Sequence, residues 1–425
     1  MKKLMLVSLL VLAFGFAQTL RPQFLDNLKK KTEEKIKKEG EKRVNDKINK
    51  GIEKGYDEAE KQVTGSGDIK KVDSTKSKDN GKNIQTKNEN ETNIKAVINS
   101  KYDFIPGEKV IFFDDFTSEN IGDFPIQWNT TGSGEVVTTN ISEGRWFYIT
   151  NGRGATTLDA PLTLPENYTI EFNVIPTKDK KNNNNTTFSF SIISTKKPKD
   201  LVYGLARPGD AGIRFSFEYA NYYSTYFNDH SPELKGIENE PRLLSDKKYR
   251  ISICVQKTRI KLYVDEQKLF DLPKVMSQNY KYNMVRFDRG TTMFSNFRIA
   301  TGLPDMRSKL ITEGKLISYG IYFDVNKDVV KPESYPSIKE IANILKDYPN
   351  VKIKIVGHTD SDGDDKSNLD LSKRRAASVK NSLVSDFNIE ASRIETDGKG
   401  ESEPVAQNDS AVNKALNRRV EFIKI

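Results

Sequence analysis

The chain has 425 residues, of which 36% are hydrophobic and 30% charged, and its formal net charge is +9. This length exceeds one ordinary hydrophobic core, so we expect two folded units plus tails, and no nucleic-acid-binding motif accompanies the dispersed lysines and arginines. One cysteine, Cys254, and two histidines, His230 and His358, exclude a disulfide framework and match no metal-ligand spacing, so we expect no metal or cofactor.

The first residues have the pattern of a secretory signal peptide. Lys2 and Lys3 precede an apolar run at residues 4–16, and Ala17 is a small residue suited to cleavage. The run is shorter than the roughly 20 residues that cross a bilayer as a helix. We therefore expect residues 1–17 to be removed on export, and because no cysteine follows them we expect no lipoprotein anchor.

Two polar segments follow the signal peptide. Residues 18–62 are charged with a narrow apolar stripe, which favours a solvated or partner-dependent helix. The stripe consists of residues spaced by multiples of four: Leu28, Ile36, Val44, Ile48, Ile52 and Tyr56. Residues 63–104 are rich in Gly, Ser, Lys, Asn and Thr and have too few apolar side chains to offset the entropy of ordering, so we interpret them as a disordered linker.

Residues 105–303 alternate between apolar and polar side chains along many short segments. Ile170 and Phe172 share one face of such a segment, so Glu171, like Glu218 in another segment, is predicted to face solvent. Cys254 is expected to be packed within a strand. Strands are predicted at residues 145–150, 168–174, 187–194, 213–219, 248–256, 259–264 and 293–300. With no helical pattern between them, the prediction is an all-β sandwich of two sheets.

Part of this region resembles a concanavalin A-like or laminin-G-like jelly roll. The similar segments are residues 249–255, 259–265, 267–272 and the closing segment 294–300. The resemblance implies a fold that often binds carbohydrate, so a group of aromatic residues either stacks on sugar rings or packs within the sheet: Tyr222, Tyr223, Tyr226 and Phe227. The Glu-x-Asp-x-x-Glu strand that supplies the two carboxylates of related hydrolases is absent, so we expect no catalysis here.

Residues 304–425 have mixed helical and strand patterns. Strands are predicted at residues 315–323, 351–356, 393–396 and 419–425. Helices are predicted at residues 335–346 and 371–387, where apolar side chains recur at helical spacing. The order β-α-β-α-β-β predicts a small α/β domain, and the whole chain is therefore expected to be multidomain.

Three groups of residues make the last domain recognisable. They are Gly357, His358, Thr359 and Asp360; Asn368, Leu371, Ser372, Arg375, Ala376 and Val379; and Asn417, Arg418, Arg419, Val420 and Glu421. Together they resemble the OmpA-like peptidoglycan-binding domain, which is also found in the peptidoglycan-associated lipoprotein and in flagellar stator proteins. The resemblance implies a protein of the Gram-negative outer membrane or periplasm.

The charges in these groups fit the implied ligand. Arg375 shares a helix face with Leu371 and Val379, so its guanidinium is expected to be half-buried and to need an anionic partner or ligand. Asp360, just after a strand, supplies the opposite charge. Such a pair suits a zwitterion, and the resemblance implies the diaminopimelate residue of the peptidoglycan stem peptide. It also implies that Asn326, Thr359, Asn368 and Arg418 line the pocket; alternatively, Asp360 and Arg375 pair only with each other and brace the fold.

The loop 361–367 is unusually acidic, with Asp362, Asp364 and Asp365. It could favour cationic groups or accept calcium, although the ligand order of an EF-hand loop is absent. His358 is expected to pack or hydrogen-bond rather than to act as a general base, because no nucleophile accompanies it.

The leading hypothesis is a non-enzymatic envelope protein that binds peptidoglycan and engages outer-membrane proteins or glycans through its sandwich. One alternative is a secreted glycan-binding or glycan-hydrolysing protein whose last domain only localises it. Another makes the sandwich a protein-interaction module within a surface complex.

Overall fold

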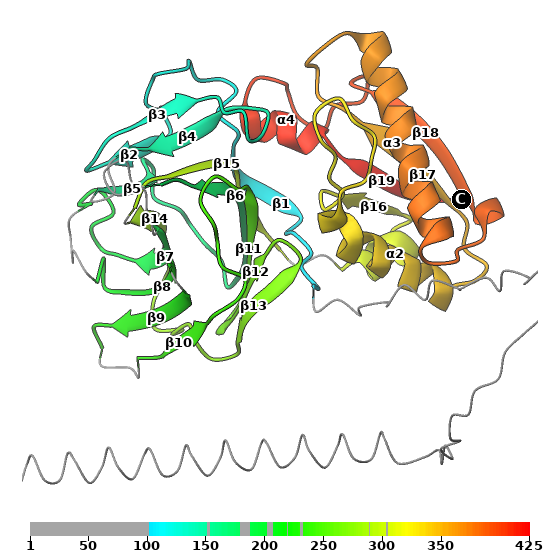
Figure 1. Ribbon diagram of the computed structural model, residues 1–425. Helices are drawn as coiled ribbons and strands as arrows, with labels where there is room; N and C mark the ends of the chain where they lie inside the picture. Colours follow the sequence, from blue (N-terminus) through cyan, green and yellow to red (C-terminus); the bar gives the residue numbers. More distant parts are fainter. Residues whose placement is uncertain are drawn as a thin grey trace, which may run out of the picture. The chain divides into compact units, whose positions relative to one another are not determined.

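The computed structural model describes residues 102–150, 154–178, 188–201, 207–218, 220–229, 233–288, 290–302 and 305–425. All of them belong to one compact unit, Ile94–Ile425. The predicted signal peptide, the charged helical segment and residues 63–101 of the predicted linker lie outside the described residues. Strands β1 to β15 form the first folded part of the described chain, and β16 to β19 with three helices form the second (Figure 1).

The first part consists of two antiparallel sheets. Its strands are β1 (Lys109–Asp114), β2 (Trp128–Thr130), β3 (Gly134–Val137), β4 (Trp146–Ile149), β5 (Ala155–Leu158), β6 (Asn167–Pro176), β7 (Phe188–Ser194), β8 (Ala211–Phe217), β9 (Asn221–Phe227), β10 (Lys235–Glu238), β11 (Tyr249–Gln256), β12 (Arg259–Val264), β13 (Gln267–Leu272), β14 (Met284–Asp288) and β15 (Thr292–Thr301). One sheet has the order β13-β12-β11-β6-β15-β4-β3, with β1 also paired to β15, and the other has the order β10-β9-β8-β7-β14-β5-β2. The predicted strands are confirmed, with ends that shift by one or two residues.

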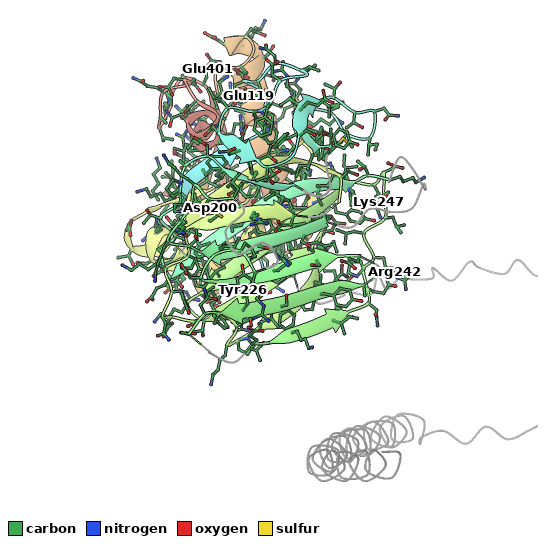
Figure 2. The ribbon with its side chains drawn as sticks, turned by 90° about the vertical axis from the view of Figure 1, so that its left-hand side faces the viewer. Glu119, Asp200, Tyr226, Arg242, Lys247 and Glu401 are labelled. Carbon is green, nitrogen blue, oxygen red and sulfur yellow. The ribbon has the colours of Figure 1, made fainter. Side chains whose placement is uncertain are left out.

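The two sheets share one hydrophobic core. Alternate side chains of both sheets point into it, and its centre is aromatic: the Phe287 and Phe294 rings stack with centroids 4.3 Å apart, and Trp128 packs edge-on against Phe294. Each fully buried aromatic side chain contributes roughly 1.5–3 kcal/mol. Of the predicted group of aromatic residues, Tyr226 and Phe227 are buried in the sheet, whereas Tyr222 is exposed. Figure 2 shows the strands from another side, with Tyr226 labelled.

The prediction that Glu171 faces solvent is wrong. The side chain does point away from the core, opposite Phe172, but it is only 2% exposed. Its carboxylate pairs with Arg250 and with Arg298, at 2.8 Å from Arg298 Nη1, and it accepts a hydrogen bond of 2.7 Å from the Tyr322 hydroxyl. Tyr322 belongs to the second folded part, which covers this face of the sheet. A period-two pattern identifies the face of a strand but not what packs on it.

The segment before β1 packs on the same sheet. Tyr102 and Phe104 are buried with Cys254 and Tyr263, and Asp103 accepts a hydrogen bond of 2.7 Å from the Tyr263 hydroxyl. Burial raises the pKa of the Cys254 thiol to about 11, which agrees with the predicted packed and unreactive cysteine. The ordered chain therefore includes residues that the sequence assigns to the end of the linker.

The second part is a small α/β domain. Its elements are η1 (Ser308–Thr312), β16 (Lys315–Ser318), η2 (Pro332–Ser334), α2 (Tyr335–Asp347), β17 (Ile353–His358), α3 (Asp365–Ser385), η3 (Ala391–Arg393), β18 (Ile394–Gly400), α4 (Ala411–Asn417) and β19 (Val420–Lys424). The sheet order is β16-β19-β17-β18, with only β17 and β18 parallel. Apolar side chains of α2 and α3 pack on this sheet around one core.

The predicted order of helices and strands is confirmed, and three details differ. The first predicted strand ends at Ser318, so residues 319–331 form a loop. The second predicted helix begins at Asp365 instead of residue 371. Helix α4 was not predicted because its seven residues carry no clear apolar period. Among the described helices, none has the length and apolar composition needed to cross a membrane.

We expect Glu171→Gln to lower the free energy of unfolding by about 3–5 kcal/mol, because it leaves two buried guanidinium groups without their carboxylate. Urea denaturation at pH 7 would measure the loss. Glu143→Gln, at an exposed position between β3 and β4, is the matched control and should change stability by less than about 0.5 kcal/mol. Equal stability of the two variants would contradict the assigned role of Glu171.

The same carboxylate should make stability pH-dependent. Burial alone would raise the pKa of Glu171, but the charges of Arg250 and Arg298 outweigh burial and hold that pKa below its ordinary value. A lowered pKa in the folded state stabilises the fold above the unfolded pKa of roughly 4.3, and this contribution disappears as pH falls through the folded pKa. The stability difference between the wild type and Glu171→Gln should therefore shrink below about pH 4, as measured by denaturation at several pH values.

Candidate functional site

The predicted site lies where β17 ends. β17 is a central strand, paired with β19 on one side and β18 on the other. Thr359 and Asp360 follow it directly, and the Thr359 amide donates to the Gly400 carbonyl at 2.9 Å. Both side chains are buried, at 4% and 7% exposure. The strand end thus holds the Asp360 carboxylate in a fixed position.

Gly357 of the recognised motif and Gly398 of β18 allow α3 to approach this sheet closely. A Cβ atom at Gly357 would lie 2.2 Å from the Ser372 carbonyl oxygen, and one at Gly398 would lie 2.4 Å from the Lys373 amide nitrogen. Ser372 is itself fully buried and donates from its hydroxyl to the Leu369 carbonyl. These residues bring α3, which carries Arg375, against β17, which leads to Asp360.

The acidic loop between β17 and α3 has structural partners. Asp364 caps α3, because its carboxylate accepts hydrogen bonds from the amides of Lys366 and Ser367 at 3.1 and 3.2 Å. The bonds from Ser367 hold the pKa of Asp364 below its ordinary value. Asp362 pairs with Lys414 at 2.7 Å. Among the described residues, no group of three or more His, Cys, Asp or Glu side chains could hold a metal ion.

Arg375 is half-buried, as predicted from its helix face. Its guanidinium lies over the Phe323 ring at 4.8 Å and donates to the carbonyls of Lys327 and Asp324 at 3.0 and 3.2 Å. These two bonds flank Asn326, an exposed residue with φ of 55°. Arg375 therefore holds the loop that presents Asn326.

Arg375 also lies close enough to Arg418 and Asp360 for their charges to shift its pKa. Burial and then the like charge of Arg418 lower the pKa of Arg375 to about 10, against the opposing charge of Asp360. The side chain is therefore cationic at neutral pH. Among the ion pairs of the described residues, none joins Arg375 to Asp360, so the alternative in which these two only brace each other does not match the geometry.

In the motif from Asn417 to Glu421, most side chains stabilise the fold and one, that of Arg418, belongs to the candidate site. Asn417 bonds through its side chain to the backbone of Val405 and Ala406, and Arg419 pairs with Glu421 at 2.8 Å while donating to the Glu403 carbonyl. Arg418, in contrast, pairs with Asp360 through Nη1 and Oδ2 at 2.5 Å. It is 34% exposed along its side chain, so this pair is accessible from solvent.

The remaining predicted residues differ in what their side chains do. The amide nitrogen of Asn368 donates to Glu401 at 2.6 Å and to the carbonyls of Asp362 and Asp360, so Asn368 shapes the loop around Asp360. Glu401 is labelled at the top of Figure 2. The buried Thr359 hydroxyl has no hydrogen-bond partner within the described structure, and it stands next to Asp360. Thr359 thus has a buried hydroxyl beside Asp360 without a partner among the described residues, whereas the Asn368 side chain is already engaged.

His358 is buried, with Nε2 3.6 Å from Glu421, in keeping with the predicted packing role. A separate open depression on this domain is lined by Lys373, Arg374, Ala377, Thr396 and Asp397. It contains none of the predicted site residues.

The contribution of the Asp364 cap to the stability of the fold should be measurable. We expect Asp364→Ala to lower the free energy of unfolding by about 1 kcal/mol, because two amides at the start of α3 lose their acceptor. Asp365→Ala removes the neighbouring acidic side chain without removing the cap bonds and serves as the control. Thermal denaturation would distinguish them, and equal losses in both variants would show that general charge near the helix end, not the cap, matters.

Comparison with known proteins identifies relatives of the second folded part of the chain. The OmpA family matches residues 322–418, so this part of the chain is an OmpA family domain. The chain is 42% identical over 111 residues to the outer membrane porin F of Pseudomonas aeruginosa, covering 26% of this chain and 32% of the porin. It is 40% identical over 102 residues to the probable lipoprotein YiaD of Escherichia coli, covering 24% of this chain and 46% of that protein.

Among solved structures, the peptidoglycan-associated lipoprotein of Burkholderia pseudomallei is 30% identical, with 25% of this chain and 88% of that chain covered and a TM-score of 0.24. The chain spans about a third of the length of the outer membrane porin F proteins that it matches.

Proposed function

We propose that this chain is a non-enzymatic protein of the cell envelope whose OmpA family domain binds peptidoglycan non-covalently. The match to that family and the outer-membrane names of its relatives support the compartment and the general ligand. The finer proposal is that the domain recognises the diaminopimelate residue of the stem peptide. The observation that carries it is the cluster of Asp360, Arg375 and Arg418 at the end of β17.

The chemistry of the cluster suits the end of a diaminopimelate side chain, which has an ammonium and a carboxylate on one carbon. Asp360 would accept hydrogen bonds from the ammonium group. Arg375 would donate to the carboxylate from Nη1 and from the second N–H of Nη2, because its Nε and one N–H of Nη2 already bond to the carbonyls of Lys327 and Asp324. The exposed Asn326 would add a neutral hydrogen bond, and the buried Thr359 hydroxyl, which has no partner within the described structure, would add another on local opening of the site. Asn368 would act indirectly by fixing the loop that surrounds Asp360.

Binding would be specific for a zwitterion, because a ligand with a single charge cannot pair with both Asp360 and Arg375. A simple anion would be attracted by Arg375 and Arg418 but repelled by Asp360. A simple amine would be attracted by Asp360 but repelled by the two arginines. A zwitterion provides a partner for both Asp360 and Arg375, which avoids the cost of leaving either charge uncompensated. No bond is made or broken in this scheme, so the domain retains its ligand without catalysis.

The remainder of the chain would connect this domain to other envelope components. We propose that the sandwich, with the concanavalin A-like character of its strand series, engages an outer-membrane protein or a glycan. The glycan-hydrolysing alternative gains no support from Glu171, because this carboxylate is buried and paired with two arginines. It is therefore neither open to a glycan nor free to serve as one of the two carboxylates that hydrolyse glycosidic bonds.

The test uses purified sacculi and the full chain in a pull-down titration. We expect Asp360→Ala and Arg375→Ala each to weaken binding roughly tenfold or more, since each removes a charge-assisted hydrogen bond worth about 1.5–3 kcal/mol. Arg374→Ala is the matched control, because it removes a neighbouring arginine of α3 that pairs with Asp328 and Asp370.

The control variant should bind like the wild type. Full binding by both site variants, with folding verified by circular dichroism, would rule out the proposed pocket. Comparable losses in all three variants would point to a general attraction between cations and an anionic wall.

A further inference from the structure

Arg418 lies between two carboxylates that come from different folded parts. Its Nη1 contacts Asp360 Oδ2 at 2.5 Å, and its Nη2 lies 3.7 Å from Oδ2 of Asp115, which directly follows β1 of the sandwich. The guanidinium also lies 5.4 Å from the centre of the Phe113 ring. Helix α4, which ends immediately before Arg418, packs against β1 (Figure 1). The sandwich therefore reaches the residues of the proposed wall-binding site.

The sequence around Asp115 fixes the direction of its carboxylate. Phe113 and Asp115 are two residues apart and share one side of the strand, whereas Asp114 points to the other side and accepts from the Trp128 indole at 2.9 Å. The other oxygen of Asp115, Oδ1, accepts from the amide and the hydroxyl of Thr117 at 3.1 and 2.6 Å. With Oδ1 held in this way, Oδ2 is left toward Arg418. The side chain of Asp115 is only 16% exposed.

This arrangement bears on ligand binding, because Arg418 occupies the acceptor that a ligand ammonium needs. Oδ2 of Asp360 is held by Arg418 and Oδ1 accepts from the Asp362 amide at 3.3 Å, so an incoming ammonium competes with the guanidinium for this carboxylate, and the displaced cation then needs another anion nearby. Asp115 is that anion. It also balances the cluster: Arg375 and Arg418 outnumber Asp360 by one charge, and Asp115 brings the four side chains to zero, which favours a ligand that carries both charges.

We infer that Asp115 of the sandwich is a positioning residue of the wall-binding site, which takes over Arg418 when a ligand ammonium pairs with Asp360. The inference rests on the proposed function and extends it: the sandwich is part of the recognition apparatus. It predicts that the affinity of the last domain depends on a side chain outside that domain.

The experiment is calorimetric titration of the full chain with a soluble stem peptide that ends in meso-diaminopimelate. Asp115→Asn should weaken binding roughly fivefold, the upper range for a partly exposed ion pair. Asp115→Glu should recover part of the loss because it restores the carboxylate. Asp159→Asn, an exposed aspartate of the sandwich that forms no ion pair within the described structure, is the control and should bind like the wild type.

A double-mutant cycle separates positioning from general stabilisation. If Asp115 acts through Arg418, then adding Asp115→Asn to an Arg418→Gln variant should change affinity by less than about twofold. A full fivefold loss in that background would overturn the inference, and so would unchanged binding by Asp115→Asn alone. Urea denaturation of each variant verifies that the protein remains folded, and if Asp115→Asn does not fold, Asp115→Ser, which also removes the carboxylate, takes its place in the cycle with Arg418→Gln.

The two proposals fail in different ways. Absence of binding by the wild-type chain would remove the proposed function itself. Binding by the wild type that is lost with Asp360→Ala but unaffected by Asp115→Asn would leave the proposed function intact and exclude only the sandwich from the site.

Discussion

A buried carboxylate joins the two folded parts of this protein. Glu171 projects from the middle of the larger sheet, on the side away from the sandwich core, and is enclosed by Arg250, Arg298 and the Tyr322 hydroxyl. The Arg250 guanidinium also lies 4.2 Å from the centre of the Tyr322 ring. Glu171, Arg250 and Arg298 all belong to the sandwich, and the α/β domain contributes the Tyr322 hydroxyl, so this domain keeps the paired charges buried by covering the sheet. The contact between Arg418 and Asp115 depends on this arrangement.

Much of the site could be predicted from the sequence because its signals are local. Asp360 follows a strand, and Arg375 shares a helix face with Leu371 and Val379, so position and partial burial both follow from periodicity. Which motif residues stabilise the fold and which belong to the site could not be predicted. Asn368 and Arg418 are both polar residues of recognised groups, yet Asn368 is engaged by the loop whereas Arg418 reaches Asp360, and only the three-dimensional packing distinguishes them.

The errors have physical causes of two kinds. Glu171 was placed in solvent because alternation reports the face of a strand, and the cover on that face comes from Tyr322, 151 positions later in the chain. The start of α3 was placed too late because its first two turns are polar, although Asp364 followed by Asp365 is a recognisable helix-capping signal. Predicting the burial of Glu171 requires knowledge of contacts between distant parts of the chain. The start of α3 can be predicted from the local sequence.

The aromatic residues that precede β1 have a mechanical consequence for the proposed attachment to the cell wall. The chain on the N-terminal side meets the sandwich at Tyr102 and Phe104, which are buried against Tyr263, while Asp103 pairs with Lys261 and Lys268. Tension applied along that chain would first have to extract these rings and separate these charges before it reached the hydrogen bonds between β1 and β15. Strand β1 ends beside Asp115, so a pull that detached it would also withdraw the partner of Arg418, and wall attachment would become sensitive to force.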